Sequence, residues 1–309
     1  MKELASAVRS AVAKVVVGQD EVIERMVCAA ACGGHVLLQG PPGVAKTLLA
    51  RAFARTLGLD FARAQFTPDM LPSDLTGTMI LRGDELVFRP GPVFTNILLA
   101  DEINRTPPKT QSALLEAMQE QQVTVDGEAR ALPSPFFVIA TQNPIEYEGT
   151  YALPEAQLDR FLMQLEVGYP TVENERAMLA LPRDGVRPLG LDAVPQVASA
   201  EDLAQARRAL NAVTAEPTVA AYVIDLIRRT RELPGVVLGA SPRAATHLLV
   251  AAQAAAALAG RAFVTPDDVA DAAPAVLGHR LVLTPDAELE RFTALDAIRI
   301  AVGEVAVPR

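Results

Sequence analysis

The chain of 309 residues contains no tryptophan, only two cysteines, and few aromatic side chains, which make up 5% of it. It also contains no run of basic residues, and its 28 Lys and Arg residues face 37 Asp and Glu residues, for a net charge of -9. Proteins that bind nucleic acid usually carry clustered cationic side chains with aromatic ones among them. The composition therefore argues against a nucleic-acid-binding protein.

The cysteines and the apolar segments exclude further classes. Cys28 and Cys32 lie four residues apart on an expected helix, without a Cys or His partner at ligand spacing, so they make a poor metal site. We expect two reduced, packed thiols in a cytoplasmic protein. Arg9 and Lys14 interrupt the N-terminal apolar stretch, which argues against a secretory signal. The most apolar span, residues 244–259, is mostly alanine and too short to cross a bilayer, so we expect no membrane span.

One glycine-bearing turn is the most informative segment that the chain does contain. It follows a short apolar run and opens an amphipathic stretch, and it reads Gly40-Pro41-Pro42-Gly43-Val44-Ala45-Lys46-Thr47. Strand, turn, Lys-Thr and helix in this order are typical of a phosphate-binding loop. Backbone N–H groups and the positive end of the helix would face the phosphates. Lys46 would reach the β- and γ-phosphates of ATP, and the Thr47 hydroxyl would bind Mg²⁺.

Ala45 departs from the usual pattern G-x-x-x-x-G-K-[ST], which has glycine at this position. The left-handed backbone region costs about 1 kcal/mol or more for a residue with a Cβ atom. We therefore expect a right-handed backbone at Ala45. The alternative interpretation of the whole segment is a chance Gly/Pro turn before a helix.

A second apolar run, residues 97–100, ends in Asp101-Glu102. A run that is apolar on both faces predicts a buried parallel strand, and ligands in open α/β sheets bind beyond the carboxyl ends of such strands. Asp101 could hold Mg²⁺ through its hydration shell, and Glu102 could polarise an attacking water. A pair of residues capping a helix is the alternative.

Five strand-like segments alternate with helical patterns in the first half of the chain. They cover residues 36–39, 61–66, 97–100, 136–141 and 161–167. This alternation predicts an α/β fold with a five-stranded parallel sheet. From residue 169 onward the pattern is helical and rich in alanine, which predicts a core of residues 1–168 and a helical lid of residues 169–309.

Two excursions interrupt the alternation and predict β-hairpins. One joins residues 78–81 to 86–88 through Arg82-Gly83-Asp84, and the other covers residues 122–132 with an Asp-Gly turn. Each could be a simple connection. Two projecting hairpins on one core nevertheless favour contact with another molecule.

Four further segments carry a resemblance to the MoxR family of AAA+ ATPases. They are residues 98–105, 111–120, 140–144 and 153–161. The resemblance spans almost the full chain and is densest between Gly18 and Phe161. It implies an AAA+ P-loop core with two β-hairpin insertions, a C-terminal all-α lid domain, and acceptance of alanine before the P-loop lysine.

The resemblance also implies roles for single residues. Asn143, after the strand at 136–141, matches the first sensor, which orients the water that Glu102 polarises; Asn143-Pro144 also predicts a turn. Arg160 matches the arginine finger, which reaches the γ-phosphate held by a neighbouring subunit. A surface ion pair with Asp159 is the alternative for Arg160.

Four more residues are candidates for the site. Ser241-Pro242 predicts a helix start, so Arg243 lies in the first turn, where a cation opposes the helix dipole unless an anion is near. Arg243 matches the second sensor, which contacts the γ-phosphate from the helical domain. Gly18 and Gln19 match the loop that lines the adenine pocket. Arg105 is a further basic candidate at a subunit interface.

The leading hypothesis is Mg²⁺-dependent hydrolysis of ATP by a homo-hexamer that remodels or matures protein complexes in a chaperone-like way. The resemblance implies a protein client, and partners that carry a von Willebrand factor A domain. The alternatives are a slow nucleotide-gated protein-binding switch without motor activity and a DNA-associated AAA+ motor, against which the net charge argues. The histidines His35, His247 and His279 share no spacing that suggests a catalytic base, and we expect His35 to be structural.

Overall fold

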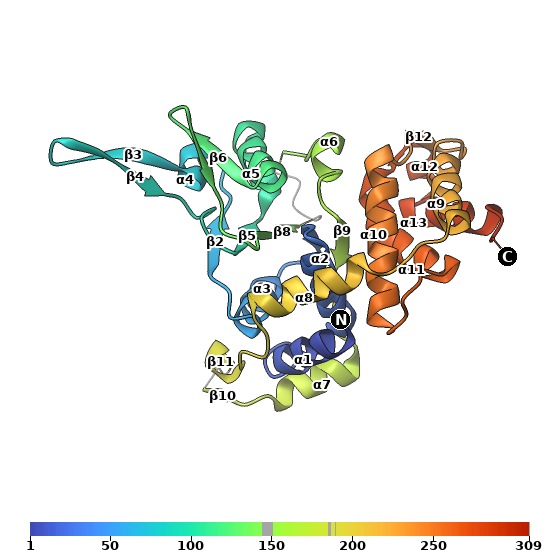
Figure 1. The fold of residues 1–309 in the computed structure, drawn as a ribbon, viewed down its shortest axis with the longest axis horizontal. Coiled ribbons are helices and arrows are strands. Elements are labelled where there is room, and N and C mark those ends of the chain that lie inside the picture. The colour runs from blue at the N-terminus through green and yellow to red at the C-terminus, as the bar shows by residue number, and fades with distance from the viewer. Residues whose placement is uncertain (144–150, 185–186, 189, 309) are drawn as a thin grey trace.

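The computed structural model describes residues 1–143, 151–184, 187–188 and 190–308. A central sheet lies between layers of helices, one hairpin projects at one end of the molecule, and a group of helices lies at the other (Figure 1). In the part of the chain that is described, no helix is long and apolar enough to cross a membrane.

The central sheet has five parallel strands in the order β2-β5-β8-β1-β9. Their bounds are Val36–Gln39 for β1, Phe61–Gln65 for β2, Ile97–Asp101 for β5, Phe137–Gln142 for β8 and Met163–Glu166 for β9. The predicted five-stranded parallel sheet is confirmed. The strands β2 and β9 form its two edges, so β5, β8 and β1 occupy the middle.

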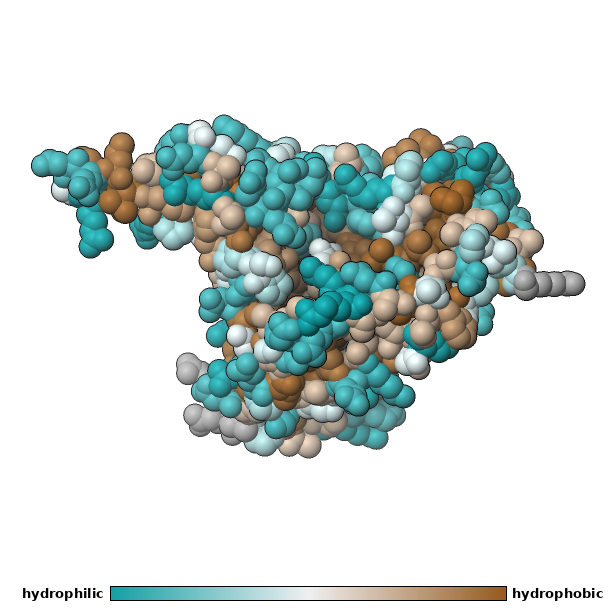
Figure 2. All heavy atoms as spheres, in the orientation of Figure 1, coloured by the Kyte–Doolittle hydropathy of each residue, from teal (hydrophilic) through white to brown (hydrophobic). Residues whose placement is uncertain are grey.

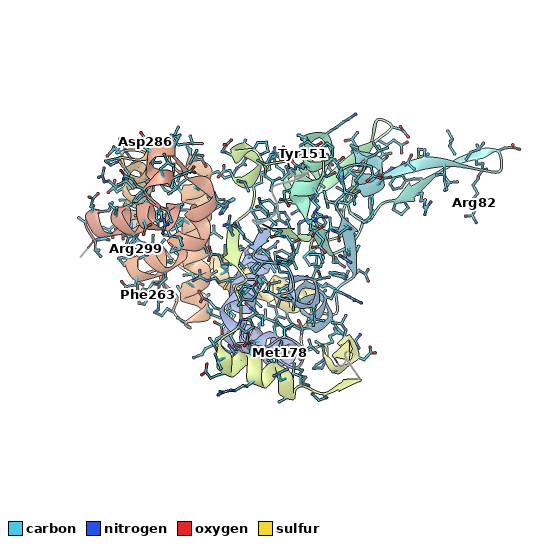
Figure 3. All side chains as sticks on the ribbon, turned by 180° about the vertical axis from the view of Figure 1, so that it is seen from behind. Arg82, Tyr151, Met178, Phe263, Asp286 and Arg299 are labelled. Carbon is cyan, nitrogen blue, oxygen red and sulfur yellow. The ribbon has the colours of Figure 1, made fainter. Side chains whose placement is uncertain are left out.

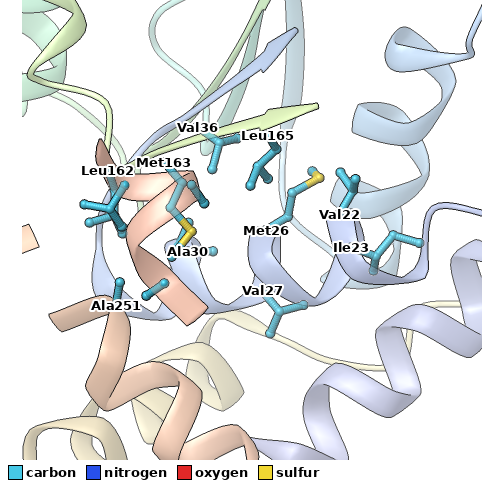
Figure 4. Packing of buried hydrophobic residues seen from close by; sticks show 14 of the residues in the cluster. Val22, Ile23, Met26, Val27, Ala30, Val36, Leu162, Met163, Leu165 and Ala251 are labelled. Carbon is cyan, nitrogen blue, oxygen red and sulfur yellow. The ribbon is translucent and has the colours of Figure 1, made fainter. Parts of the chain in front are cut away.

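Both faces of the three middle strands are buried, which explains why β1, β5 and β8 read as mostly apolar runs. In β5, Ile97 and Leu99 join one hydrophobic cluster, whereas Leu98 and Ala100 join the other. The first cluster includes α1 (Lys2–Val12), α2 (Asp20–Cys32) and α3 (Lys46–Thr56), and the second includes α5 (Pro108–Glu120). Figure 4 shows Met26 and Ala30 of α2 packed against Val36, Met163 and Leu165 of the sheet.

Both predicted hairpins are present and antiparallel. The first pairs β3 (Gly77–Arg82) with β4 (Glu85–Pro90), and the second pairs β6 (Gln122–Val125) with β7 (Glu128–Ala131). The second turns at Asp126-Gly127, where both residues have positive φ, as a two-residue hairpin turn requires. A short helix, α4 (Pro72–Thr76), precedes the first hairpin.

The hairpin β3–β4, here called the projecting hairpin, extends away from the core (Figure 1). Arg82 lies toward its far end (Figure 3). Its outer part exposes large apolar side chains, which form the brown area on the projecting arm in Figure 2: Ile80, Leu81, Leu86 and Val87. Apolar side chains on an extended arm are typical of a surface that contacts another protein.

The C-terminal helices gather on one side of the sheet, as the resemblance implies (Figure 1). They are α9 (Pro217–Thr230), α10 (Pro242–Leu258), α11 (Pro266–Leu277), α12 (Pro285–Leu289) and α13 (Ala294–Glu304). The helices α10, α11 and α12 each begin with a Ser or Thr cap followed by proline, which fixes their first turns. A short antiparallel pair, β12 (Val236–Leu238) with β13 (Val282–Leu283), adds to them and was not predicted.

Three more helices precede this group in the chain. They are α6 (Glu155–Leu158), α7 (Val172–Ala180) and α8 (Ala200–Asn211), with a short strand pair, β10 (Arg183–Asp184) and β11 (Arg187–Pro188), between the last two. The helix α8 packs on α2 and α10, and Arg207 of α8 donates to the Ala31 carbonyl. The predicted boundary at residue 168 stays a prediction.

Cys28 and Cys32 are free thiols on α2, as predicted. Burial raises the pKa of the Cys28 thiol to about 12 and that of Cys32 further. Both thiols therefore stay protonated at neutral pH, and a thiolate is the reactive form of cysteine.

His35 links the sheet to the helix α5. Its Nδ1 accepts a hydrogen bond from the Val138 N–H at 3.0 Å, so its Nε2 carries the proton and donates to the Met118 carbonyl at 3.2 Å. Burial lowers the pKa of His35 from 6.5 to about 4, so the imidazole is neutral. These contacts agree with a structural role.

The stability of the folded chain is expected to fall in mild acid. Between pH 6.5 and about pH 4, His35 is protonated in the unfolded chain and neutral in the folded chain. The free energy of unfolding therefore has its full value above this range and decreases as the pH falls through it. From about pH 7.5 to about pH 5 the loss from His35 alone is about 2 kcal/mol. Denaturant unfolding at several pH values measures it. In the variant His35→Gln this position cannot titrate, so the free energy of unfolding should depend less on pH than in the wild type. An equal pH dependence in the variant and the wild type would contradict this prediction.

Candidate active site

The phosphate loop, the two carboxylates and Asn143 lie at one edge of the central sheet. The strands β5, β8 and β1 are neighbours and parallel, with Gln39 of β1 level with Gln142 of β8. Asp101 is the last residue of β5, Asn143 follows β8, and the phosphate loop follows β1. The structure therefore brings these predicted site residues together at the edge where α/β sheets bind ligands.

The phosphate loop is held close to the end of β9. A Cβ atom on Gly40 would lie 2.1 Å from the Val167 carbonyl oxygen, so only glycine fits there. The Lys46 ammonium donates to the carbonyls of Gly40 and Pro41, the latter at 3.1 Å. Lys46 also begins α3, so the lysine and the N-terminus of an eleven-residue helix face the same loop.

The expectation of a right-handed backbone at Ala45 is wrong. Ala45 has φ 63° and ψ 25°, which is the left-handed region, and it is the N-cap residue of α3. The chain tolerates a strain of about 1–2 kcal/mol there. Strained residues persist where the surrounding structure fixes them, and they cluster at functional sites. The loop geometry that usually calls for glycine is therefore kept in spite of the alanine side chain.

Asp101 is buried and its two oxygens have separate partners. Its Oδ1 accepts from the Thr141 hydroxyl at 2.6 Å. Its Oδ2 accepts from the Thr47 hydroxyl at 3.3 Å and from the guanidinium of Arg63 at 3.0 Å (Nε) and 2.7 Å (Nη2). The two residues predicted to hold Mg²⁺, Thr47 and Asp101, are thus in direct contact.

This oxygen pair fits magnesium. Mg²⁺ prefers hard oxygen ligands and in nucleotide sites takes one or two from the protein, with phosphates and waters supplying the others. A threonine hydroxyl and a carboxylate oxygen 3.3 Å apart, beside the N-terminus of α3, are such a pair.

Glu102 stands at the rim with its carboxylate partly exposed. Its backbone is left-handed, with φ 58°, and its N–H donates to the Thr141 hydroxyl at 2.9 Å. Its Oε2 accepts from Gln65 Nε2 at 2.6 Å and lies 3.3 Å from Arg105 Nε. Side chains on both sides therefore hold the carboxylate in one position. Arg105, expected at a subunit interface, pairs with Glu102 of its own chain.

Three residues of this network were not predicted from the sequence: Arg63, Gln65 and Thr141. Arg63 and Gln65 lie on β2, which pairs with β5 and brings Gln65 level with Asp101. A signal was present, since polar residues at positions 63 and 65 alternate with apolar ones and must share one face of a strand. Nothing in the sequence identifies that strand as the neighbour of the strand that ends in Asp101.

Asn143 directly follows β8 and is buried, with 5% of its surface exposed. It thus lies at the same edge of the sheet as the phosphate loop and the acidic pair. The predicted Asn143-Pro144 turn lies partly outside the described residues, because Pro144 is not among them.

Arg160 and Arg243 lie together at the other end of the sheet. Both line a pocket of about 230 Å³. Residues that directly precede β1 line the same pocket, whereas the phosphate loop follows β1, at the opposite end of that strand. The other lining residues are Gly33, Gly34, His35, Met118, Gln119 and His247. The structure therefore does not bring Arg160 or Arg243 to Lys46 of the same chain.

Arg160 and its neighbour Asp159 contact different parts of the chain. Its Nη1 donates to the Leu115 carbonyl at 2.7 Å. Asp159 accepts from Ser241 Oγ at 3.0 Å and from Arg280 Nε at 2.8 Å, and lies 3.9 Å from Arg243. These three partners of the Asp159 carboxylate thus come from the C-terminal helices.

Arg280 is almost completely buried, with 2% of its side chain exposed. Besides Asp159, it donates to the Phe161 carbonyl at 2.6 Å and to His247 Nδ1 at 2.6 Å. Burial, and then the nearby Arg280 charge, lower the pKa of His247 to about 4, so His247 is neutral and can accept. The segment that carries Arg160 is therefore tied to the C-terminal helices.

Gly18 and Gln19 cap α2 near the end of β9. Gly18 has φ +81°, and a Cβ atom there would lie 2.6 Å from Asn174 Nδ2 of α7. Gln19 is 8% exposed, and its Nε2 donates to the Gly168 carbonyl at 3.4 Å. Both residues lie on the side of the sheet that carries the phosphate loop.

Comparison with known proteins identifies the family. The model of the ATPase family associated with various cellular activities (AAA) matches residues 35–163, and that of the AAA lid domain matches residues 228–299. The chain is 48% identical to an uncharacterized protein of Bacillus subtilis, YeaC, over 96% of this chain and 92% of that protein. It is 45% identical to the chaperone MoxR1 of Mycobacterium tuberculosis, over 96% and 81% of the two chains.

A solved structure gives the same result. A putative ATPase from Cytophaga hutchinsonii superposes with a TM-score of 0.91 at 41% identity, over 100% of this chain and 96% of that one. With the phosphate loop, the acidic pair and the helical lid in place, the chain belongs to the MoxR family of AAA ATPases.

Proposed function

We propose that this AAA ATPase assembles into a homo-hexameric ring and uses ATP hydrolysis to remodel or mature protein complexes. The observation that carries the proposal is the separation of the predicted residues into two groups at opposite ends of the sheet. Lys46, Asp101 and Glu102 lie at one end, and Arg160 and Arg243 at the other. If one chain held a complete site, all of these residues would lie at the same end of its sheet. A ring in which one end of each chain meets the opposite end of its neighbour would complete every site.

Within one chain, residues 1–168 would supply the nucleotide site. Gly18 and Gln19 would contact the base, and the phosphate loop with Lys46 would hold the phosphates. Thr47 and Asp101 would hold Mg²⁺, which would neutralise charge on the phosphates. Glu102, fixed by Gln65 and Arg105, would take a proton from the attacking water, and Asn143 would orient that water.

The neighbouring chain would supply the other two cations. Its Arg160 would stabilise charge that develops on the γ-phosphate, and its Arg243 would bind the same group. Arg243 lies in the first turn of α10, where its charge opposes the helix dipole, and an incoming anion would relieve that cost. Residues 169–309 would act as a lid that carries Arg243.

Chaperone-like work is supported by two observations. The relative MoxR1 is named a chaperone, and the projecting hairpin exposes apolar side chains away from the core. We propose that this hairpin contacts a protein client, with a von Willebrand factor A domain protein as a candidate partner. A slow nucleotide-gated switch would use the same residues and differ in turnover.

The rate of phosphate release per chain, measured over a range of protein concentrations, tests this proposal. A site shared between chains requires the rate per chain to rise with concentration as the assembly forms, in step with the mass measured by light scattering. A rate that is constant from monomer to oligomer would contradict the shared site. Addition of a candidate partner separates a motor, which should accelerate, from a switch, which should change only its affinity.

A further inference from the structure

The Arg63 guanidinium and the Thr47 hydroxyl meet at the same oxygen. Arg63 Nε and Nη2 lie 3.0 Å and 2.7 Å from Asp101 Oδ2, and the Thr47 hydroxyl lies 3.3 Å from that atom. The other oxygen, Oδ1, already accepts a short bond from Thr141. A cation that Thr47 and Asp101 bind together must therefore lie against Oδ2, where Arg63 also binds.

Arg63 approaches this oxygen from the solvent side. It lies on β2, an edge strand, and its side chain is 47% exposed, whereas that of Asp101 is 9% exposed. Asp101 is fixed by Thr141 and by its place in the buried strand β5, so the carboxylate has little freedom to turn toward a second position. Arg63, by contrast, can withdraw into solvent without breaking the sheet.

From this geometry we propose that Arg63 competes with Mg²⁺ for Asp101 and so raises the Mg²⁺ concentration at which the site binds its nucleotide. The proposal rests on the proposed role of Thr47 and Asp101 in holding Mg²⁺. A guanidinium and a divalent cation at one carboxylate oxygen repel each other. When Mg²⁺ binds with the nucleotide, it must either displace Arg63 from Asp101 Oδ2 or bind in spite of repulsion by the Arg63 guanidinium. In both cases Arg63 shifts the loading of the site to a higher concentration of free Mg²⁺.

Titration with a fluorescent ADP analogue at several free Mg²⁺ concentrations tests this inference without hydrolysis. We expect Arg63→Gln to lower the half-saturating Mg²⁺ concentration by about fivefold, the size of an ion pair of this exposure. Arg63→Lys keeps the charge and should stay close to the wild type. Arg299→Gln removes an exposed guanidinium that pairs with Asp296 on α13, and as the matched control it should change nothing.

Three results would overturn the inference. An unchanged Mg²⁺ requirement in Arg63→Gln would show that the guanidinium withdraws at no cost. A higher requirement would show that Arg63 positions Asp101 for the metal instead of competing with it. Nucleotide affinity that is independent of Mg²⁺ in the wild type would remove the competition altogether. A wild-type protein that binds no nucleotide would instead contradict the proposed function, so the two failures are distinguishable.

Discussion

Replacing Arg160 with alanine is expected to lower the rate of ATP hydrolysis by about 10³–10⁵-fold and to leave nucleotide affinity nearly unchanged. An arginine that stabilises the transferring phosphoryl group contributes this much to the rate. Affinity is kept because the phosphate loop, Asp101 and Glu102 lie at the opposite end of the sheet. Phosphate release and binding of a fluorescent nucleotide measure the two effects on the same preparation. Arg299→Ala removes an arginine from the exposed face of α13 and is the control.

A mixture of two inactive variants tests the sharing of sites between chains directly. Arg160→Ala keeps the acidic pair and Glu102→Gln keeps the arginine, so a mixed ring contains interfaces with every group in place. Mixing the two should restore part of the activity. A mixture that stays as inactive as its components, while light scattering shows mixed assembly, would contradict a role for Arg160 in the neighbouring site.

Glu102→Gln is expected to lower turnover by about 10²–10⁴-fold, the contribution of a positioned general base, with nucleotide still bound. The amide can still accept the hydrogen bond from Gln65, so the rim should keep its shape. Single-turnover hydrolysis and nucleotide binding, measured side by side, separate the lost chemical step from lost affinity.

The matched control for Glu102→Gln is Glu290→Gln, which makes the same chemical change at the exposed C-cap residue of α12. It should hydrolyse ATP at the wild-type rate. If Glu102→Gln also turns over normally, another group takes the proton from water. Loss of nucleotide binding in Glu102→Gln would instead indicate that the carboxylate mainly stabilises the rim.

The sequence predicted the sheet and most of the rim because those features have local signatures. Five strand-like segments separated by helical patterns predicted the strands, and the order of turn, lysine and helix predicted the phosphate loop. The acidic pair followed from the same logic, since Asp101 and Glu102 end a run that is apolar on both faces.

The features that were missed depend on which elements become neighbours. Arg63 and Gln65 act through the pairing of β2 with β5, and Arg243 shares a pocket with Arg160 because the C-terminal helices pack at that end of the sheet. The amino-acid sequence indicates neither the pairing of β2 with β5 nor the packing of the C-terminal helices at that end of the sheet. The backbone of Ala45 was predicted wrongly because propensity favours the right-handed region and the loop geometry overrides it.

Asp159 accepts bonds from Ser241 and Arg280, while Arg160 beside it donates to the Leu115 carbonyl of α5. Arg160 is therefore attached to the C-terminal helices through its neighbour and to the core through its own guanidinium. If the chains assemble as proposed, a tilt of the C-terminal helices would pull Arg160 against its bond to α5, and the position of the lid would then influence hydrolysis in the adjacent chain.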